Sequence, residues 1–201
     1  MKTWLDDEDD DEREEKSVQS TDSFMVKMLK TRTILLSGEI NKELAEKTIR
    51  QLLLLEDKGD EPIKIFIDSP GGDADAGYAI FDMIRFVSPP VWTIGMGLVA
   101  SAAAIIELAS PRERRVGLPN SHYLIHQPLS VIRGVATDIE IHARELEKLR
   151  AKINRLIADE TGMAFEQVEK DTDRDYWMNA DEAVKYGLIS RILTRKSDVE
   201  W

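Results

Sequence analysis

The segment VWTIGMGLVASAAAIIE, residues 91–107, gives the clearest indication of the fold class. Residues 91–97 form a continuous apolar run, which is typical of a strand buried on both of its faces. The small and apolar residues that follow Ser101 predict a helix. A buried strand that passes directly into a helix is typical of α/β proteins, and it places Ser101 at the junction.

The same alternation precedes this stretch. Residues 33–36 and 63–67 predict two further strands. The segment 41–59 predicts a helix because its apolar residues recur on one helical stripe and Gly59 ends the pattern. A second helical pattern follows the turn DSPGGD and ends before Pro89 and Pro90. Strands alternating with helices indicate parallel strands joined by right-handed crossovers.

The second half of the chain continues with a short strand at 123–125 and a long helix at 137–162. Thr137 and Glu140 predict a capping box at the start of the long helix, and Gly162 predicts its end. Asn179 and Glu182 predict a second capping box before a last short helix. With no repeat and no Pro- or Gly-rich linker, the chain is expected to form one domain.

The composition limits the classes of function. The net charge is −11, and −7 of it lies in the first fifteen residues, so we expect residues 1–18 to form an acidic tail that cannot build a core. An acidic chain without a basic stripe argues against nucleic-acid binding. The chain has no cysteine, which excludes disulfides and thiol catalysis. No apolar run is long enough to span a membrane, and the cytoplasm is the expected location.

Two turns could carry chemistry, because active sites of α/β sheets lie where strands end and helices begin. At the first turn, Gly71 and Gly72 can adopt backbone angles that direct their N–H groups at one acceptor, although the pair alone is weak evidence and a simple tight turn is the favoured explanation. At the second turn, Ser101 could act as a nucleophile with the Ala102 N–H facing a developing oxyanion. The alternative is that small residues here serve only to pack the helix on the sheet.

A serine nucleophile needs a base, and the chain has three histidines. His142 lies within the long charged helix. His126 is favoured over His122 because it ends a predicted strand, two residues before Pro128. The orienting carboxylate stays open among three candidates of the segment DTDRD, namely Asp171, Asp173 and Asp175.

Five segments, in order, resemble the proteolytic subunit of the ATP-dependent Clp protease, over about residues 23–194. They are DSPGG (68–72), GLVASAAA (97–104), LPNSHYLIHQPL (118–129), ATDIEIHARE (136–145) and DTDRDYWMNADEAVKYGLI (171–189). The resemblance implies a catalytic triad of Ser101, His126 and Asp175. It further implies that the oxyanion binds the N–H groups of Gly72 and Ala102, and that Asp173 and Arg174 form contacts between rings.

The fold that the resemblance implies is a repeated ββα core of the crotonase type, with a projecting handle of a strand and a helix at about 129–161. The domain would span 19–196, followed by a short C-terminal tail at 197–201. The family assembles as two stacked seven-membered rings around a chamber that admits unfolded polypeptides. A partner AAA+ unfoldase uses ATP to thread these substrates, and the subunit itself needs no cofactor or metal.

The sequence departs from the family pattern at three places. The lead-in to the serine is GLVAS, with Leu98 and Val99 where the family has GQxAS, and Ala102 replaces a common Met. These changes are expected to alter the cleavage preference without abolishing the chemistry. The third departure is the acidic block at the N-terminus, where the family carries a hydrophobic start that contacts the unfoldase.

Three other functions compete with this interpretation. A crotonase-type enzyme acting on acyl-CoA thioesters would share the paired amides but would need no triad. A signal-peptide peptidase of the same superfamily would need a membrane anchor and a lysine base. A structural, weakly active or inactive subunit of a mixed ring is the main alternative, although all three triad residues are present.

The acidic tail generates the first prediction, that it sits at the axial pore and filters entry. Deleting residues 2–16 should change the degradation of long unfolded chains more than the hydrolysis of short peptides, because short peptides diffuse past a charged segment more easily. Rates for both substrates, measured on the same preparation, test this. An equal effect on both substrates would contradict it.

Overall fold

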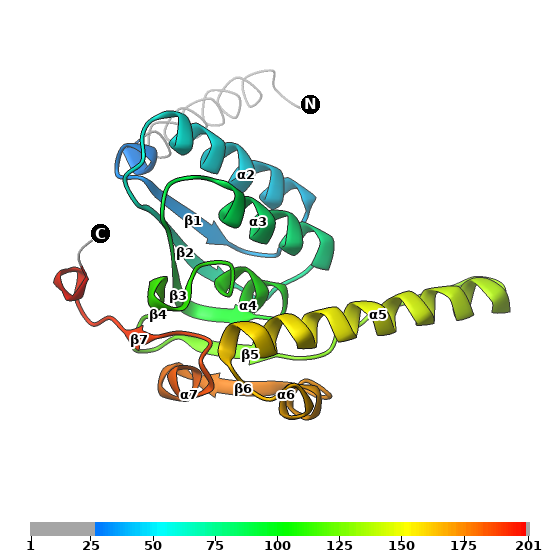
Figure 1. Ribbon diagram of the computed structural model, residues 1–201. Coiled ribbons are helices and arrows are strands. Elements are labelled where there is room, and N and C mark those ends of the chain that lie inside the picture. The colour runs from blue at the N-terminus through cyan, green and yellow to red at the C-terminus, as the bar shows by residue number, and fades with distance from the viewer. Residues whose placement is uncertain (1–26, 200–201) are drawn as a thin grey trace, which may run out of the picture.

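A seven-stranded sheet forms the centre of the described chain, residues 27–199, in this computed structural model (Figure 1). Its strands are β1 (Thr33–Ser37), β2 (Ile63–Ser69), β3 (Val91–Ala100), β4 (Arg115–Gly117), β5 (His122–Ile125), β6 (Tyr176–Asn179) and β7 (Arg191–Ile192). The order is β1-β2-β3-β4-β7, with β5 paired to β3 and β6 paired to β5. All of these pairs are parallel except β5 with β6. The predicted α/β class with a mainly parallel sheet is therefore confirmed.

Helices alternate with these strands along the chain. They are α2 (Lys42–Asp57), α3 (Ala74–Phe86), α4 (Ala102–Glu107), α5 (Ala136–Thr161), α6 (Phe165–Asp171) and α7 (Ala180–Tyr186), with short 3-10 turns η1 (Arg112–Arg114) and η2 (Lys196–Asp198). Figure 1 shows α2, α3 and α4 side by side over one part of the sheet. The early helices therefore cover the strands that lead to Ser101.

The main core lies between the sheet and these helices. The inward face of β2, which is Ile63, Ile65 and Ile67, is fully buried against apolar residues of α2, α3 and α4. A smaller apolar cluster contains Ile94 and Val199, the last described residue. Val199 thus packs on the body, within the segment 197–201 expected to be a C-terminal tail, whereas η2 is exposed.

Strand β3 changes partners halfway along its length. Thr93–Gly95 pair with β4, whereas Leu98–Ala100 pair with β5. The change occurs at Gly97, which has a φ of 54°. A side chain at Gly97 would lie 2.5 Å from Asp68 Oδ1, the same atom that accepts a hydrogen bond of 3.0 Å from the Leu98 N–H. Glycine is needed here because both the positive φ and the close carboxylate exclude a Cβ.

Most expected elements are present, and their ends differ by a few residues. Strand β3 runs to Ala100, three residues beyond the expected 91–97, because its outer half pairs with β5. The second capping box is confirmed: the Asn179 side chain accepts from the Glu182 N–H, and the Glu182 carboxylate accepts from the Asn179 N–H. The short strands β4, β6 and β7 were not predicted, since two to four residues carry too little pattern.

The capping box expected at Thr137 and Glu140 is wrong. Helix α5 begins earlier, with Val135 as its N-cap, and no side chain caps it. The Val135 carbonyl already accepts the N–H of Ile139 at 3.1 Å, so Thr137 lies inside the first turn. Gly162 ends the helix in the left-handed region, with a φ of 79°, as predicted.

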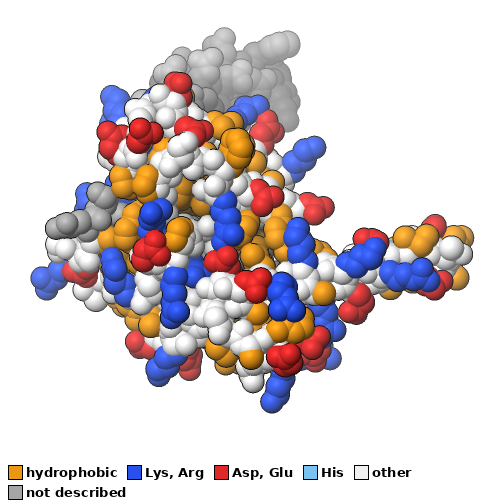
Figure 2. Space-filling view, viewed as in Figure 1, with side chains coloured by type: hydrophobic (Ala, Val, Ile, Leu, Met, Phe, Trp, Pro, Cys, Tyr) orange, Lys and Arg blue, Asp and Glu red, His pale blue; other side chains and the backbone are white. Residues whose placement is uncertain are grey.

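The first half of α5 projects away from the body (Figure 1). Its buried residues all lie in the last three turns, from Ile153 to Thr161. The projecting helix matches the handle expected at 129–161, but the strand expected with it is not formed: among residues 27–199, the segment 127–135 pairs with no strand. Figure 2 shows hydrophobic side chains at the outer end of the projection.

Two glycines make room for Tyr123, which is fully buried at the centre of β5. A Cβ at Gly95 would lie 2.3 Å from the Tyr123 hydroxyl, and one at Gly117 would lie 2.4 Å from it. The hydroxyl accepts a hydrogen bond of 3.1 Å from Ser121 Oγ. The ring therefore fills space that two neighbouring strands leave open.

This packing generates a prediction for stability. Gly95→Ala should lower the free energy of unfolding by about 1–3 kcal/mol, because the added methyl overlaps the buried tyrosine. Urea unfolding measures the change. The double variant Gly95→Ala/Tyr123→Phe should recover part of the loss, since it removes the atom in closest contact. Full stability in the single variant would show that the contact does not limit packing.

Candidate functional site

Ser101 lies between β3 and α4 in a strained backbone conformation. Its φ is 56° and its ψ is −121°, a region that residues other than glycine rarely adopt. The Ser101 N–H donates to the Leu124 carbonyl at 2.9 Å, which continues the pairing of β3 with β5. Serine commonly caps a helix through its hydroxyl, but the Ser101 hydroxyl does not cap α4. It is turned instead toward the end of β5.

The side chains of Ser101, His126 and Asp175 form a continuous chain. The distance from Ser101 Oγ to His126 Nε2 is 2.8 Å, and the distance from His126 Nδ1 to Asp175 Oδ1 is 3.0 Å. One tautomer satisfies both contacts: Nδ1–H donates to the carboxylate, and Nε2 accepts from the hydroxyl. The chain of contacts has the connectivity of a nucleophile, a base and an orienting acid.

The other histidines lie elsewhere. His122 is exposed at the opposite end of β5 from His126. His142 lies on α5, where its Nε2 is 2.9 Å from Ser130 Oγ. Of the three histidines, only His126 therefore contacts Ser101, which agrees with the argument from the strand end.

The three aspartates of the segment DTDRD have different partners. Asp171 accepts hydrogen bonds from Gln167 and from the Tyr186 hydroxyl. Asp173 forms an ion pair of 3.1 Å with Arg150 on α5. Asp175 alone contacts the imidazole. Arg174, predicted with Asp173 as a ring contact, is exposed to solvent in the single chain.

Two backbone N–H groups lie free beside Ser101. Ile40 bonds to both neighbours of Gly72, since its N–H donates to the Gly71 carbonyl and its carbonyl accepts from the Asp73 N–H. In a parallel bridge of this kind the N–H of Gly72 points away from Ile40. The Ala102 N–H belongs to the first turn of α4, where backbone donors have no partner in the helix. Neither donor is used by another group within residues 27–199.

Close packing holds the two turns together. A Cβ at Gly71 would lie 2.6 Å from the Ala100 carbonyl oxygen and 2.7 Å from Ser101 Cβ, and one at Gly72 would lie 2.2 Å from the Ile40 carbonyl oxygen. Both glycines also have positive φ angles, of 90° and 149°. The glycine pair thus allows the turn and also lets its backbone approach Ser101 and Ile40 closely.

A group of residues that the sequence analysis missed anchors the loop that carries Asp175. Gln127 donates through its backbone N–H to the Thr172 carbonyl and through its side chain to the Asp173 carbonyl, both at 2.6 Å. The buried Thr172 hydroxyl donates to Asn154 on α5 at 2.8 Å. The position of Gln127 directly after His126 in the sequence could have indicated this role, because polar residues next to a functional side chain commonly hold the surrounding structure in place.

A cavity of about 660 Å³ opens beside Ser101, bounded by α3, α4, the end of β5 and α5. Apolar side chains form much of its wall, including Ile105, Leu149 and Ile153. Asp75 and Glu145 lie at the same cavity. Within residues 27–199, no cluster of acidic or histidine side chains could hold a metal ion, and no helix could cross a membrane. The cavity has room for a peptide side chain next to the serine.

Comparisons with known proteins agree with this geometry. A family model described as Clp protease matches residues 14–196. The ATP-dependent Clp protease proteolytic subunit 2 of Treponema denticola is 65% identical over 189 residues, 94% of each chain. Proteolytic subunit 3 of Rhizobium etli is 50% identical over 86% of this chain and 89% of its own. A solved structure of a ClpP1 mutant from Listeria monocytogenes is 47% identical, with a TM-score of 0.83 over 88% of this chain and 99% of that chain.

The contacts of Ser101 generate a prediction for its reactivity. A fluorophosphonate, which reacts with activated serine hydroxyls, should label Ser101 in the unmodified protein. His126→Ala should slow labelling by about 100-fold or more, because it removes the base. Asp175→Asn should also slow it, because the amide favours the wrong imidazole tautomer. Mass spectrometry of the labelled peptide gives the site and the rate, and labelling at another serine would contradict the assignment.

Proposed function

The chain belongs to the Clp protease family and is an endopeptidase of the Clp type, and from this premise we propose that it cleaves unfolded polypeptides through an acyl-enzyme on Ser101. The observation that carries the proposal is the unbroken contact from Ser101 through His126 to Asp175. The family's proteolytic role supplies the substrate class, and the geometry supplies the residues.

The reaction follows from these contacts. His126 Nε2 takes the proton of Ser101 as its oxygen attacks the carbonyl carbon of a peptide bond. Asp175 stabilises the resulting imidazolium through Nδ1–H. The imidazolium then gives its proton to the departing amine as the C–N bond breaks, which leaves the acyl group on Ser101. Water attacks this ester with His126 again as base, and the acid product leaves.

The two free backbone donors suit the charge that forms during this reaction. The N–H groups of Gly72 and Ala102 would bind the oxyanion of the tetrahedral intermediate. One such donor contributes about 3–4 kcal/mol to the transition state in comparable sites. Both donors are fixed before substrate arrives, because Ile40 and α4 hold their backbones.

The exposed apolar residues support the assembly proposed from the family. Leu129, Val131 and Val135 precede α5, and Ile139 and Ile141 lie on its projecting half; all five are exposed in the single chain. An apolar surface of this kind needs a partner. We therefore propose that the projection joins subunits of two stacked heptameric rings, with Asp173 and Arg174 near the contact.

The remaining partners follow from the relatives' names. The relatives from Treponema denticola and Rhizobium etli are named as proteolytic subunits of an ATP-dependent Clp protease, so we propose that an AAA+ unfoldase of the Clp type consumes ATP and delivers the substrate to this chain. The subunit itself would need no cofactor. The cytoplasm stays the proposed location. Several relatives are named as subunit 2 or 3, which favours a second candidate function: a weakly active or structural subunit of a mixed ring.

Hydrolysis of a fluorogenic short peptide tests the proposed function. The purified protein should hydrolyse the peptide, and Ser101→Ala should lose essentially all turnover because no other group can form the ester. Ser197→Ala, at an exposed serine of η2, is the matched control and should keep full activity.

The other outcomes separate the alternatives. Activity that survives in Ser101→Ala would contradict the acyl-enzyme. If the unmodified protein is inactive alone but gains activity with a second Clp subunit, the mixed-ring function is favoured. An acyl-CoA thioester, included as a second substrate, should not be hydrolysed.

A further inference from the structure

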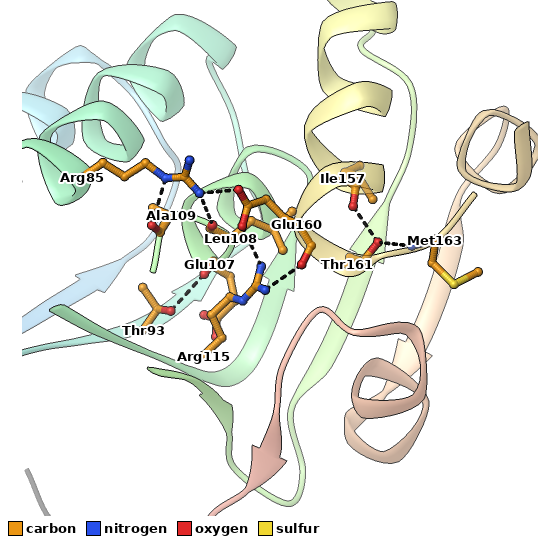
Figure 3. Close-up of polar contacts among 10 residues, drawn as sticks. All are labelled: Arg85, Thr93, Glu107, Leu108, Ala109, Arg115, Ile157, Glu160, Thr161 and Met163. Atoms are coloured by element: carbon orange, nitrogen blue, oxygen red, sulfur yellow. Dashed lines mark hydrogen bonds and ion pairs between the residues drawn. The ribbon is translucent and has the colours of Figure 1, made fainter. Parts of the chain in front are cut away.

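A group of four titratable side chains lies near the C-terminal end of α4, the helix whose other end carries Ser101 and Ala102 (Figure 3). Glu107, the last residue of α4, is fully buried, and Arg115 at the start of β4 is 1% exposed. Glu160 on α5 and Arg85 on α3 complete the set. Four different elements therefore meet at the end of a helix of only six residues.

Contacts link three of these residues, namely Arg115, Glu160 and Arg85. Arg115 Nη2 donates to the Glu160 carbonyl at 2.7 Å, and its Nη1 lies 3.5 Å from Glu160 Oε2. Glu160 Oε1 lies 2.5 Å from Arg85 Nη2. Arg85 in turn donates through Nε to the Ala109 carbonyl at 3.1 Å, just beyond the end of α4. Arg85 thus binds the backbone just beyond α4, at the end where a helix carries partial negative charge.

Glu107 is the member that packing alone does not explain. Neither of its carboxylate oxygens has a hydrogen-bond partner within the described chain, and the same holds for Nε and Nη1 of Arg115. Burial raises the pKa of Glu107 well above its ordinary value, and the charge of Arg115 opposes this shift. An apolar side chain of similar size would avoid the desolvation of both groups and often stabilises a protein. A buried acid facing a buried guanidinium is therefore a poor choice for stability at this position.

The position of α4 matters for catalysis because its two ends are close. A helix of six residues is about 9 Å long and moves as one rigid unit. A shift of its Glu107 end therefore displaces Ala102 and Ser101 by a similar distance. Displacements of about 1 Å at a reacting group lower rates by as much as 100-fold. No side chain caps the N-terminal end of α4, where the backbone hydrogen bond from Ser101 to Leu124 holds the chain, and the buried polar side chain of this helix, Glu107, lies at its other end.

We propose that Glu107 and Arg115 are positioning residues of the active site: the electrostatic interaction between the Glu107 carboxyl group and the Arg115 guanidinium, which Glu160 and Arg85 hold in place, sets where α4 presents Ser101 and the Ala102 N–H. The proposal rests on the proposed function of Ser101. It also connects the catalytic helix to the base of α5, since Glu160 is the penultimate residue of the projecting helix.

Peptide hydrolysis by variants of Glu107 tests the proposal. Glu107→Leu should lower kcat by about tenfold with KM changed less than twofold, because the substrate cavity is intact while the nucleophile is displaced. Glu107→Gln keeps the length and an oxygen that can face Arg115, and it should restore most of kcat. Glu46→Gln removes an acid from an exposed ion pair on α2 and is the matched control, expected at full activity.

A second variant covers the case in which Glu107→Leu fails to fold. Glu107→Leu/Arg115→Met removes both buried charges, so it should fold and assemble with a melting temperature at least equal to that of the unmodified protein. Its kcat should remain low. Full kcat in this double variant, or a loss of kcat that merely follows loss of assembled protein, would overturn the proposal.

Hydrogen exchange separates this proposal from the proposed function. If the unmodified protein hydrolyses no peptide, the proposed function fails, but exchange of the amides of residues 98–109 still reports on α4. Faster exchange at the start of α4 in Glu107→Leu than in Glu46→Gln supports the positioning role. Equal rates in the two variants would overturn it.

Discussion

The pairing between the outer half of β3 and β5 is the constraint on which the site depends. Three residue pairs, Leu98 to His122 through Ala100 to Leu124, place the ends of the two strands side by side. The Ser101 N–H extends the same ladder to the Leu124 carbonyl, so the serine and His126 emerge at one edge of the sheet. Gly97 makes this pairing possible, because β3 must leave β4 and turn around the Asp68 carboxylate before it can reach β5.

Asp175 is positioned by different contacts from those that position Ser101 and His126. Asp175 precedes β6, which pairs antiparallel with β5. Gln127, the residue after His126, donates to the Asp173 carbonyl and so holds the loop that carries Asp175. Thr172 and Asn154, both buried, tie the same loop to α5. The aspartate is 62% exposed at its side chain, so its position relies on these neighbours more than on its own packing. The loop, the imidazole and the base of α5 consequently form one connected unit.

Sequence reasoning succeeded where a local pattern reports directly on burial. The apolar runs of β2 and β3 and the stripes of α2 and α3 were predicted, because alternation and helical spacing follow from which face meets the core. The strand-end argument preferred His126, but the residue patterns left the aspartate open, since three acids within five residues look alike until β6 pairs with β5. Only the family resemblance selected Asp175. The prediction of a capping box at Thr137 was wrong because threonine and glutamate at this spacing also occur inside the first turn of a helix, as they do in α5. The charges of Arg115 and Glu160 gave no signal, since charged residues are usually exposed and only the tertiary fold buries them.

The active site therefore concentrates features that are unfavourable for stability. Ser101 holds a backbone conformation that costs about 1–3 kcal/mol, and the carboxyl group of Glu107 lies buried without a hydrogen bond at the far end of the same helix. The sheet beneath supplies the compensation, because each fully buried isoleucine of β2 contributes about 1.5–3 kcal/mol. A fold stabilised by its central strands can hold a strained serine and a charged helix end without loosening either. The two halves of β3 therefore have different roles: the first half, paired with β4, belongs to the core, and the second half, paired with β5, positions the catalytic residues.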